Sequence, residues 1–318
     1  MKIKTGSYTG DGSASQAITG IGFQPDVVLI KRSGASNGVI RSSTVAGNLT
    51  KDVFASAAMF AGGILSLGAD GFTVGPDARV NTAANTYFYL ALQAAASDLK
   101  VGTYIGDGID DRNITGVGFQ PDVVIVYQEA SFFPVWRSSD VPGDLTLTFG
   151  TNAPADNRIQ MFQADGFQVG NATTVNANLV THHYIAVKKA AGLLNTLTYA
   201  GNATDNRDLT GLGFLPDFVT IRGGGTTTVQ GAVRYGAEVG DNSMVWDSAE
   251  GVNRIQALQA DGFQIGTSTA VNVSGVTYYA FALKTGAPPP PPTPAAPRVH
   301  LMLKRKHWIQ RDTAAPFL

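Results

Sequence analysis

The sequence predicts an all-β fold, with three tandem antiparallel β-sandwich repeats followed by a proline-rich linker and a C-terminal arm. Three observations support this prediction. One sequence phrase occurs three times at intervals of roughly 95 residues, and repetition at a fixed period indicates tandem domains. The composition, with 37 glycines and only 15% charged residues, favours strands and turns over helices. Turn signals also recur at the regular intervals that are typical of a β-sandwich.

Three motifs recur in the same order and define the repeats. Gly-Phe-x-Pro-Asp followed by an apolar run is found at residues 22–30, 118–126 and 213–221. Ala-Asp-Gly-Phe is found at 69–72, 164–167 and 260–263, and Val-Asn at 80–81, 175–176 and 271–272. A unit of this length can bury its own core. We therefore expect β-sandwich repeats at 1–97, 98–191 and 192–286, a linker at 287–297 and an arm at 298–318.

The first two elements of each repeat are predicted strands. Residues 6–12, with counterparts at 102–108 and 197–202, indicate a short strand that enters a glycine-containing turn. The run that follows Pro-Asp is continuously apolar, which is typical of a strand buried on both faces. Proline is tolerated at the start of such a strand because no hydrogen-bond donor is needed there.

The later elements are a hairpin and a long final strand. Residues 159–169 indicate two strands joined at Asp-Gly, a pair that favours a type I′ turn. The final strand of the first repeat alternates, with Phe88, Leu90 and Leu92 on the predicted core face and Tyr87 and Tyr89 on the other. The counterparts on the core face are His183, Ile185, Val187, Tyr279, Phe281 and Leu283. We expect no helix longer than two turns, and the best helix candidate is 49–60.

Charge and composition restrict the class of protein. The chain has no cysteine, which excludes disulfides and thiolate chemistry. Its first residues lack the apolar segment of a secretory signal, and no run of about 18 apolar residues offers a membrane span. The formal net charge is -1, but the segment after residue 297 carries five basic residues and one acid. The body is therefore mildly acidic and the arm basic.

The candidate sites for catalysis or metal binding each have a structural interpretation. His182 and His183 are adjacent on a strand and point to opposite faces, so they cannot ligate one ion from a regular strand. The acids of 107–113 lack the spacing of an EF-hand and are interpreted as a solvated turn. Asp26, Asp122 and Asp217 recur, as do Arg41, Arg137 and Arg234, and we expect Asp–Arg pairs that tie a loop to the sandwich.

Further motifs also fail to indicate an enzyme. The glycine runs at 20–22 and 223–225 do not precede a helix and lack the Lys-Ser/Thr of a phosphate-binding loop. No serine, base and acid suggest a hydrolytic triad. We therefore expect a non-enzymatic protein with no catalytic residues, no cofactor and no metal site.

Two segments are predicted to bind partners. The second repeat inserts Phe132, Phe133 and Trp136 between strands, and clustered aromatics mark contact surfaces. The sequence leaves open whether they contact an external partner or a neighbouring repeat.

The arm is the second of these segments. Its residues Val299, Leu301 and Leu303 alternate with polar ones and are followed by Trp308 and Ile309. An isolated strand cannot pair with itself, so we expect it to dock on a sheet edge of another subunit. The alternatives are a disordered tail, which its apolar content argues against, and a nucleic-acid-binding arm. Four net positive charges argue against nucleic acid as the partner. The preceding prolines favour a stiff polyproline II spacer.

The motifs Gly-Phe-x-Pro-Asp-x-Val-x-Ile and Asp-Gly-Phe, with an aromatic final strand, resemble a repeat of structural proteins from tailed bacteriophages. The resemblance covers 1–286. It implies a virion protein, made in the cytoplasm of the bacterial host, with no catalytic residues. We expect a capsid-decorating, neck or tail component that binds other virion proteins and associates with itself, with no membrane partner. The alternative hypothesis is a receptor-recognising tail protein that stacks sugars on aromatics such as Trp136 or Tyr89.

Overall fold

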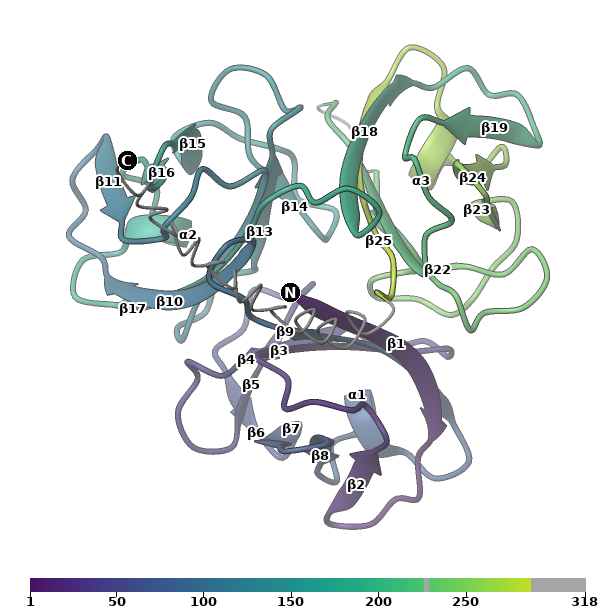
Figure 1. The fold of residues 1–318 in the computed structure, drawn as a ribbon, viewed down its shortest axis with the longest axis horizontal. Coiled ribbons are helices and arrows are strands. Elements are labelled where there is room, and N and C mark those ends of the chain that lie inside the picture. The colour runs from purple at the N-terminus through teal and green to yellow at the C-terminus, as the bar shows by residue number, and fades with distance from the viewer. Residues whose placement is uncertain (226–228, 287–318) are drawn as a thin grey trace, which may run out of the picture. The chain divides into compact units, whose positions relative to one another are not determined.

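The structure is a computed structural model that describes residues 1–225 and 229–286 (Figure 1). The predicted linker 287–297 and arm 298–318 lie outside the described residues. The same is true of the partner-binding residues predicted in the arm, which are Val299, Leu301, Leu303, Trp308 and Ile309.

The prediction of tandem β-sandwiches is confirmed. The first repeat has a large sheet of order β1-β9-β3-β4-β5-β6 and a small sheet of order β2-β8-β7, with all neighbouring strands antiparallel. Its elements are β1 (Lys2–Thr9), β2 (Gln16–Thr19), β3 (Val27–Arg32), β4 (Val39–Ser42), β5 (Leu49–Asp52), β6 (Phe60–Ala61), β7 (Ile64–Gly68), β8 (Gly71–Val74), α1 (Ala78–Asn81) and β9 (Thr86–Gln93).

The second repeat has the same topology without a counterpart of β6. Its sheets have the orders β10-β17-β12-β13-β14 and β11-β16-β15. The elements are β10 (Leu99–Ile105), β11 (Arg112–Thr115), β12 (Val123–Gln128), β13 (Val135–Ser138), β14 (Leu147–Thr148), β15 (Ile159–Gln163), β16 (Gly166–Val169), α2 (Thr173–Asn176) and β17 (Thr181–Val187).

The third repeat matches the second strand for strand. Its sheets have the orders β18-β25-β20-β21-β22 and β19-β24-β23. The elements are β18 (Leu194–Ala200), β19 (Arg207–Thr210), β20 (Phe218–Gly223), β21 (Ala232–Tyr235), β22 (Met244–Val245), β23 (Ile255–Gln259), β24 (Gly262–Ile265), α3 (Thr269–Asn272) and β25 (Thr277–Leu283).

In residues 1–225 and 229–286 the helices are three single turns, one before the final strand of each repeat. The best helix candidate in the sequence, 49–60, is not a helix, because this segment contains β5 and the first residue of β6. There the Thr50 hydroxyl accepts a hydrogen bond from Ile64 N at 2.7 Å, and pairing with β4 and β6 overrides local helix propensity. Among the described residues, no helix is long and apolar enough to cross a membrane.

Each sandwich has a core between its two sheets. In the first repeat, Val28, Ile30, Phe72, Tyr87 and Tyr89 belong to this core. The phenylalanine of each Gly-Phe motif is buried in the core of its own repeat. These residues are Phe23, Phe119 and Phe214.

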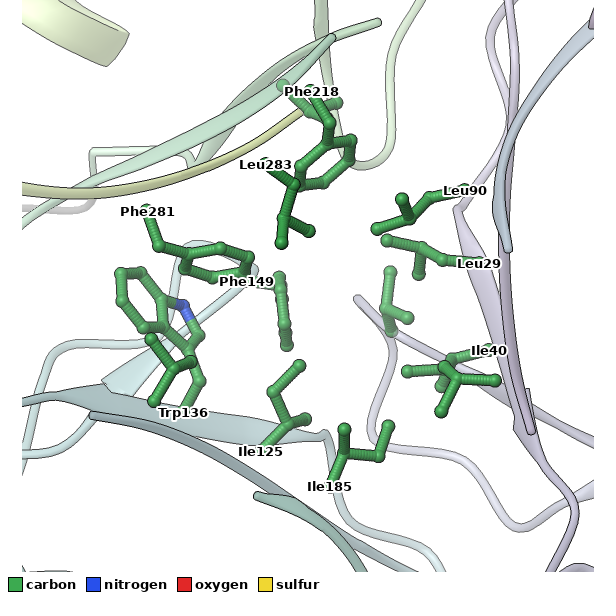
Figure 2. Close-up of a cluster of buried hydrophobic side chains, with 14 of the residues drawn as sticks. Leu29, Ile40, Leu90, Ile125, Trp136, Phe149, Ile185, Phe218, Phe281 and Leu283 are labelled. Carbon is green, nitrogen blue, oxygen red and sulfur yellow. The ribbon is translucent and has the colours of Figure 1, made fainter. Parts of the chain in front are cut away.

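A further core joins the three repeats. It is formed by the opposite faces of the three large sheets and includes Leu29, Ile125 and Phe218, together with Leu90, Ile185 and Phe281 (Figure 2). The prediction that the Pro-Asp strands are buried on both faces is therefore confirmed. The face of Phe88, Leu90 and Leu92, predicted to be the sandwich core, instead faces this shared core. The alternating sequence pattern showed that the final strand has two apolar faces. It could not show which of them packs against the small sheet.

Candidate functional site

The repeats are joined by polar contacts from one equivalent position in β3, β12 and β20. Lys31 Nζ donates to Ser248 O of the third repeat at 2.9 Å. Tyr127 Oη donates to Ser42 Oγ of the first repeat at 2.6 Å. Arg222 Nη2 donates to Asn152 O of the second repeat at 2.8 Å. Each repeat therefore bonds to the one before it in a closed cycle, in which the first repeat bonds to the third.

Two buried lysines at these contacts have no carboxylate within hydrogen-bonding distance. Lys31 Nζ also donates to Arg32 O and Gly34 O, and Lys51 Nζ donates to Ala57 O and to Ala130 O of the second repeat, both at 2.6 Å. Burial lowers the pKa of Lys31 to about 7 and that of Lys51 to about 8. Neither lysine belongs to a repeated motif, because each is present in one repeat only.

The inserted aromatics of the second repeat are not an exposed cluster. Trp136 is 1% exposed and lies in the shared core, with its ring centroid 5.2 Å from that of Phe281 of the third repeat (Figure 2). Phe133 is half-buried against the core of its own repeat. Phe132 is half-buried as well. An external partner role for Trp136 is therefore wrong, and its contact is with a neighbouring repeat.

The loop that carries these aromatics also contacts the first repeat. Met59 N donates to Glu129 O at 2.9 Å, and Ser56 Oγ donates to Ser131 O at 3.1 Å. Together with the Lys51 contact, these bonds fix the insertion against the first sandwich.

The paired histidines are packing residues. His183 is 1% exposed, stacks on Tyr127 and has its Nδ1 2.9 Å from Thr44 Oγ1 of the first repeat. His182 points to the other face, stacks on Tyr104 and has its Nδ1 3.0 Å from Val180 O. Burial lowers the pKa of His182 to about 4 and also lowers that of His183. The His182 ring is therefore neutral at pH 7, and His183 Nε2 lies 3.5 Å from a carboxylate oxygen of Glu129.

The predicted Asp–Arg pairs are not formed. Arg41 donates to the carbonyl oxygens of Leu49, Ile64, Val45 and Gly47, and Arg137 and Arg234 bind carbonyls in the same way. The aspartates instead bind the end of the repeat, where Asp26, Asp122 and Asp217 accept from the backbone nitrogens of Ala94, Lys189 and Thr285. Recurrence of both residue types did not imply that they meet.

The Asp-Gly motifs bind an earlier loop. Asp165 accepts from Gly116 N at 3.0 Å and from Gly118 N at 2.6 Å, and Asp70 and Asp261 repeat this arrangement. The hairpin is confirmed, but the type I′ turn is wrong. Its two central residues in the second repeat, Ala164 and Asp165, do not have positive φ, whereas Gly166 after them has φ +145°.

The Val-Asn motif holds the loop that follows the first strand of each repeat. In the second repeat, Asn176 Oδ1 accepts from Asp107 N at 3.0 Å, and Asn176 Nδ2 donates to Ile109 O at 2.8 Å. Asn81 and Asn272 make the equivalent bonds. The acidic segment 107–113 is thus a turn held by Asn176, as expected. The described residues contain no cluster of three or more potential metal-ligating side chains.

One buried carboxyl replaces an apolar residue. The equivalent positions Val45, Val141 and Glu238 each offer their carbonyl oxygen to an arginine of the same repeat. Glu238 is 6% exposed and accepts a bond from Tyr235 N at 2.5 Å. Burial raises its pKa to about 8. A cleft of about 330 Å³ borders Glu238, Arg234 and Asp217, but Arg234 donates to backbone carbonyls and Asp217 accepts from Thr285 N, so neither is paired with Glu238 as an acid or base.

A cleft of about 430 Å³ lies where the second and third repeats meet. Its one ionisable lining residue is Arg254, whose Nη1 already donates to Ser243 O and Ala249 O. The other lining residues are Thr151, Gln230, Val245, Ser268, Thr269 and Ala270. This lining provides neither a nucleophile with a base nor a pair of carboxylates.

Three exposed apolar side chains lie on neighbouring segments of the second repeat, and sequence reasoning missed them. We call these residues, Ile105, Ile109 and Leu179, the repeat-2 tip, and they are 60%, 64% and 82% exposed. Backbone bonds hold the tip together, with Leu179 N donating to Gly106 O and Gly108 N to Asn176 O. Comparison of the three repeats at these positions would have revealed it.

Comparison with known proteins identifies one repeat. A family model described as "Domain of unknown function (DUF7483)" matches residues 2–99, which correspond to the first repeat. No curated protein matches the chain.

Proposed function

We propose that the chain is a non-enzymatic structural protein of a tailed-phage virion. In this proposal the three sandwiches form a block that is attached to the capsid, neck or tail through the C-terminal arm. The observation that carries it is the shared core, together with the cycle of polar contacts around it. A core shared by all three repeats makes them one rigid body rather than three independent binding modules.

The repeated polar residues support a structural role. Each recurrent aspartate, asparagine and arginine binds backbone atoms of its own repeat, as described for Asp165, Asn176 and Arg41. Residues so engaged have their hydrogen-bonding capacity used by the fold. The motifs that carry the resemblance to virion proteins include such residues. We therefore interpret the repeat as an architectural unit.

The receptor-binding alternative has less support from the geometry. Trp136 and Tyr89, the aromatics considered for sugar stacking, are 1% and 6% exposed. A sugar needs an exposed ring face, and neither side chain offers one. We therefore retain the structural block as the single proposed function.

The test compares the full chain with a 1–297 truncation during particle assembly. Both forms carry the same N-terminal tag and are supplied to infected cells, and purified particles are probed for the tag. The full chain should be incorporated and the truncation should not. Matching circular dichroism spectra and melting temperatures of the two proteins serve as the folding control. Equal incorporation of both would rule out anchoring by the arm. Incorporation of both, together with binding of both to cell-surface polysaccharide, would favour the receptor-recognising tail protein.

A further inference from the structure

The hydrogen-bonded framework beneath the repeat-2 tip is the same in all three repeats. Gly10, Gly106 and Gly201 each exchange two backbone bonds with the turn before the final strand. The asparagine of each Val-Asn motif then binds the loop after that glycine. The three tips therefore differ in side chains and not in backbone construction.

Only the second repeat has large apolar residues on this framework. The position of Ile105 is occupied by Thr9 and Ala200, that of Ile109 by Ser13 and Thr204, and that of Leu179 by Ala84 and Gly275. The described chain has seven exposed large hydrophobic residues, and the repeat-2 tip contains three of them. The fold does not require apolar residues there, because two sister repeats are built without them.

The backbone conformation of Leu179 is energetically unfavourable, and the fold does not require an apolar side chain at this position. Its φ is +61°, in the left-handed region, where the first repeat has Ala84 with φ +60° and the third has Gly275 with φ +78°. A side chain with Cβ in this region costs about 1–2 kcal/mol. With 82% of the side chain exposed, little burial within the protein offsets that cost. Such a residue is explained by a contact with another molecule.

The surroundings of the tip indicate the charge of that molecule. Asp107, Asp110 and Asp111 are exposed beside Ile109, and Arg112 pairs with Asp107 at 3.3 Å, so the loop has an excess of two acids. The matching loops of the first and third repeats each contain one acid. Ile105 ends β10, which is an edge strand of its sheet in the described part of the chain. A ligand for this surface should have apolar side chains, basic side chains and a strand-like alternation.

We infer that the repeat-2 tip binds the C-terminal arm, residues 298–318, of a second copy of this chain. The arm has the matching chemistry, with Val299, Leu301 and Leu303 in alternation and five basic residues against one acid. It follows a stretch that includes five consecutive prolines, a composition that favours an extended polyproline II spacer. The inference rests on the proposed function, since it names one partner of the proposed anchoring arm.

The binding test uses residues 1–286, which contain every described strand and all four cores. The probe is a fluorescein-labelled synthetic peptide of residues 298–318, followed by fluorescence anisotropy. The test variant is Ile105→Ala, Ile109→Thr and Leu179→Gly, which installs the residues that the third repeat carries on the same framework. The matched control removes two other exposed apolar side chains, through Val239→Thr and Val252→Thr.

The peptide should bind the unmodified body, more weakly as salt increases because opposite charges contribute. The tip variant should weaken binding about tenfold or more, as loss of central apolar contacts does, and the control variant should leave it unchanged. Absence of binding, or equal binding by the tip variant, would overturn the inference.

Self-association of the full chain tests the role of the second copy. Sedimentation velocity should show concentration-dependent oligomers for the full chain but monomers for 1–286 and for the full-length tip variant. A full chain that stays monomeric while the peptide binds would overturn the role of the second copy. In the particle experiment the tip variant keeps its own arm and should be incorporated, whereas the 1–297 truncation should be excluded. Equal incorporation of the truncation would contradict the anchor, and equal peptide binding by the tip variant would contradict the tip inference.

Discussion

Single aspartates fasten loops that are distant in sequence. Asp165 lies about 50 residues after Gly116 and Gly118, and its carboxylate accepts from both of their amides. These bonds stabilise the charged form and lower the pKa of Asp165, and those of Gly22 and Gly20 lower the pKa of Asp70. The Asp-Gly-Phe motif is therefore half of a contact whose other half is the Gly-x-Gly before each Pro-Asp strand.

Asp165→Asn should change how stability depends on pH. Because the pKa of Asp165 is lower in the folded than in the unfolded protein, its contribution to stability is present above the unfolded value. It is lost as pH falls through the folded value, in the range below about pH 4. The variant should therefore be less stable than the unmodified protein at pH 7, and the difference should shrink as pH falls. Urea midpoints measured by tryptophan fluorescence from pH 7 to pH 2.5 test this. A difference independent of pH would mean that the charge has no role.

At the scale of elements, the hairpin after Asp165 depends on one glycine. Gly166 has φ +145°, and a Cβ built there would lie 2.0 Å from Ile114 O of the paired strand β11. Gly116 also has positive φ, +82°, but a Cβ there would meet nothing within 4 Å. Comparison of the two glycines therefore distinguishes the cost of a positive φ from the cost of a steric clash with the paired strand.

The variants Gly166→Ala and Gly116→Ala test this separation. Gly116→Ala should cost about 1–2 kcal/mol, the penalty of a left-handed backbone for a residue with Cβ. Gly166→Ala should cost a further 1–3 kcal/mol or so, because the methyl group must displace the paired strand. Chemical denaturation of both variants provides the comparison. Equal losses in the two variants would show that β16 can move away from β11 without penalty.

Elements were predictable where the signal was local. The buried strand after Pro-Asp and the hairpin at Asp-Gly follow from apolar runs and turn residues within a few positions. The turn type was not predictable, because Asp165 is held by Gly116 and Gly118 rather than by its own turn. The helix candidate at 49–60 is not a helix for a similar reason, since pairing with strands outside its own segment decides the conformation of β5.

The candidate site was less predictable than the fold. Sequence motifs identify residues that recur in all three repeats. Lys31 and Leu179 differ from their counterparts in the other repeats and so belong to no motif. The burial of Trp136 was also beyond local pattern, because the side chain that covers it, Phe281, belongs to another repeat.

At the scale of the whole molecule, the shared core is filled unequally by the three repeats. One layer contains Ile40, Trp136 and Val233 at equivalent positions, and another contains Val53, Phe149 and Trp246. Equivalent positions therefore hold side chains of different size, and large side chains of the second and third repeats meet, with the ring centroids of Phe149 and Trp246 5.2 Å apart. The repeats have the same fold but cannot replace one another in this core.

Trp136→Ala and Phe281→Ala should therefore be coupled across repeats. Each alone should cost about 3–5 kcal/mol, as truncation of buried aromatics does. The double variant should cost less than their sum by about 0.5–1.5 kcal/mol, the range for aromatic pairs in double-mutant cycles. Chemical denaturation of the four proteins gives the coupling energy. Strict additivity would mean that the two rings do not support each other.

Joining three repeats in one chain makes each surface feature unique. An assembly of three identical single-repeat chains would present three copies of every surface, and any contact through them would branch. In the assembly inferred above, each molecule offers one repeat-2 tip and one arm, so it binds one copy through its tip and one through its arm. Copies joined in this way form unbranched rows or closed rings rather than a branched network.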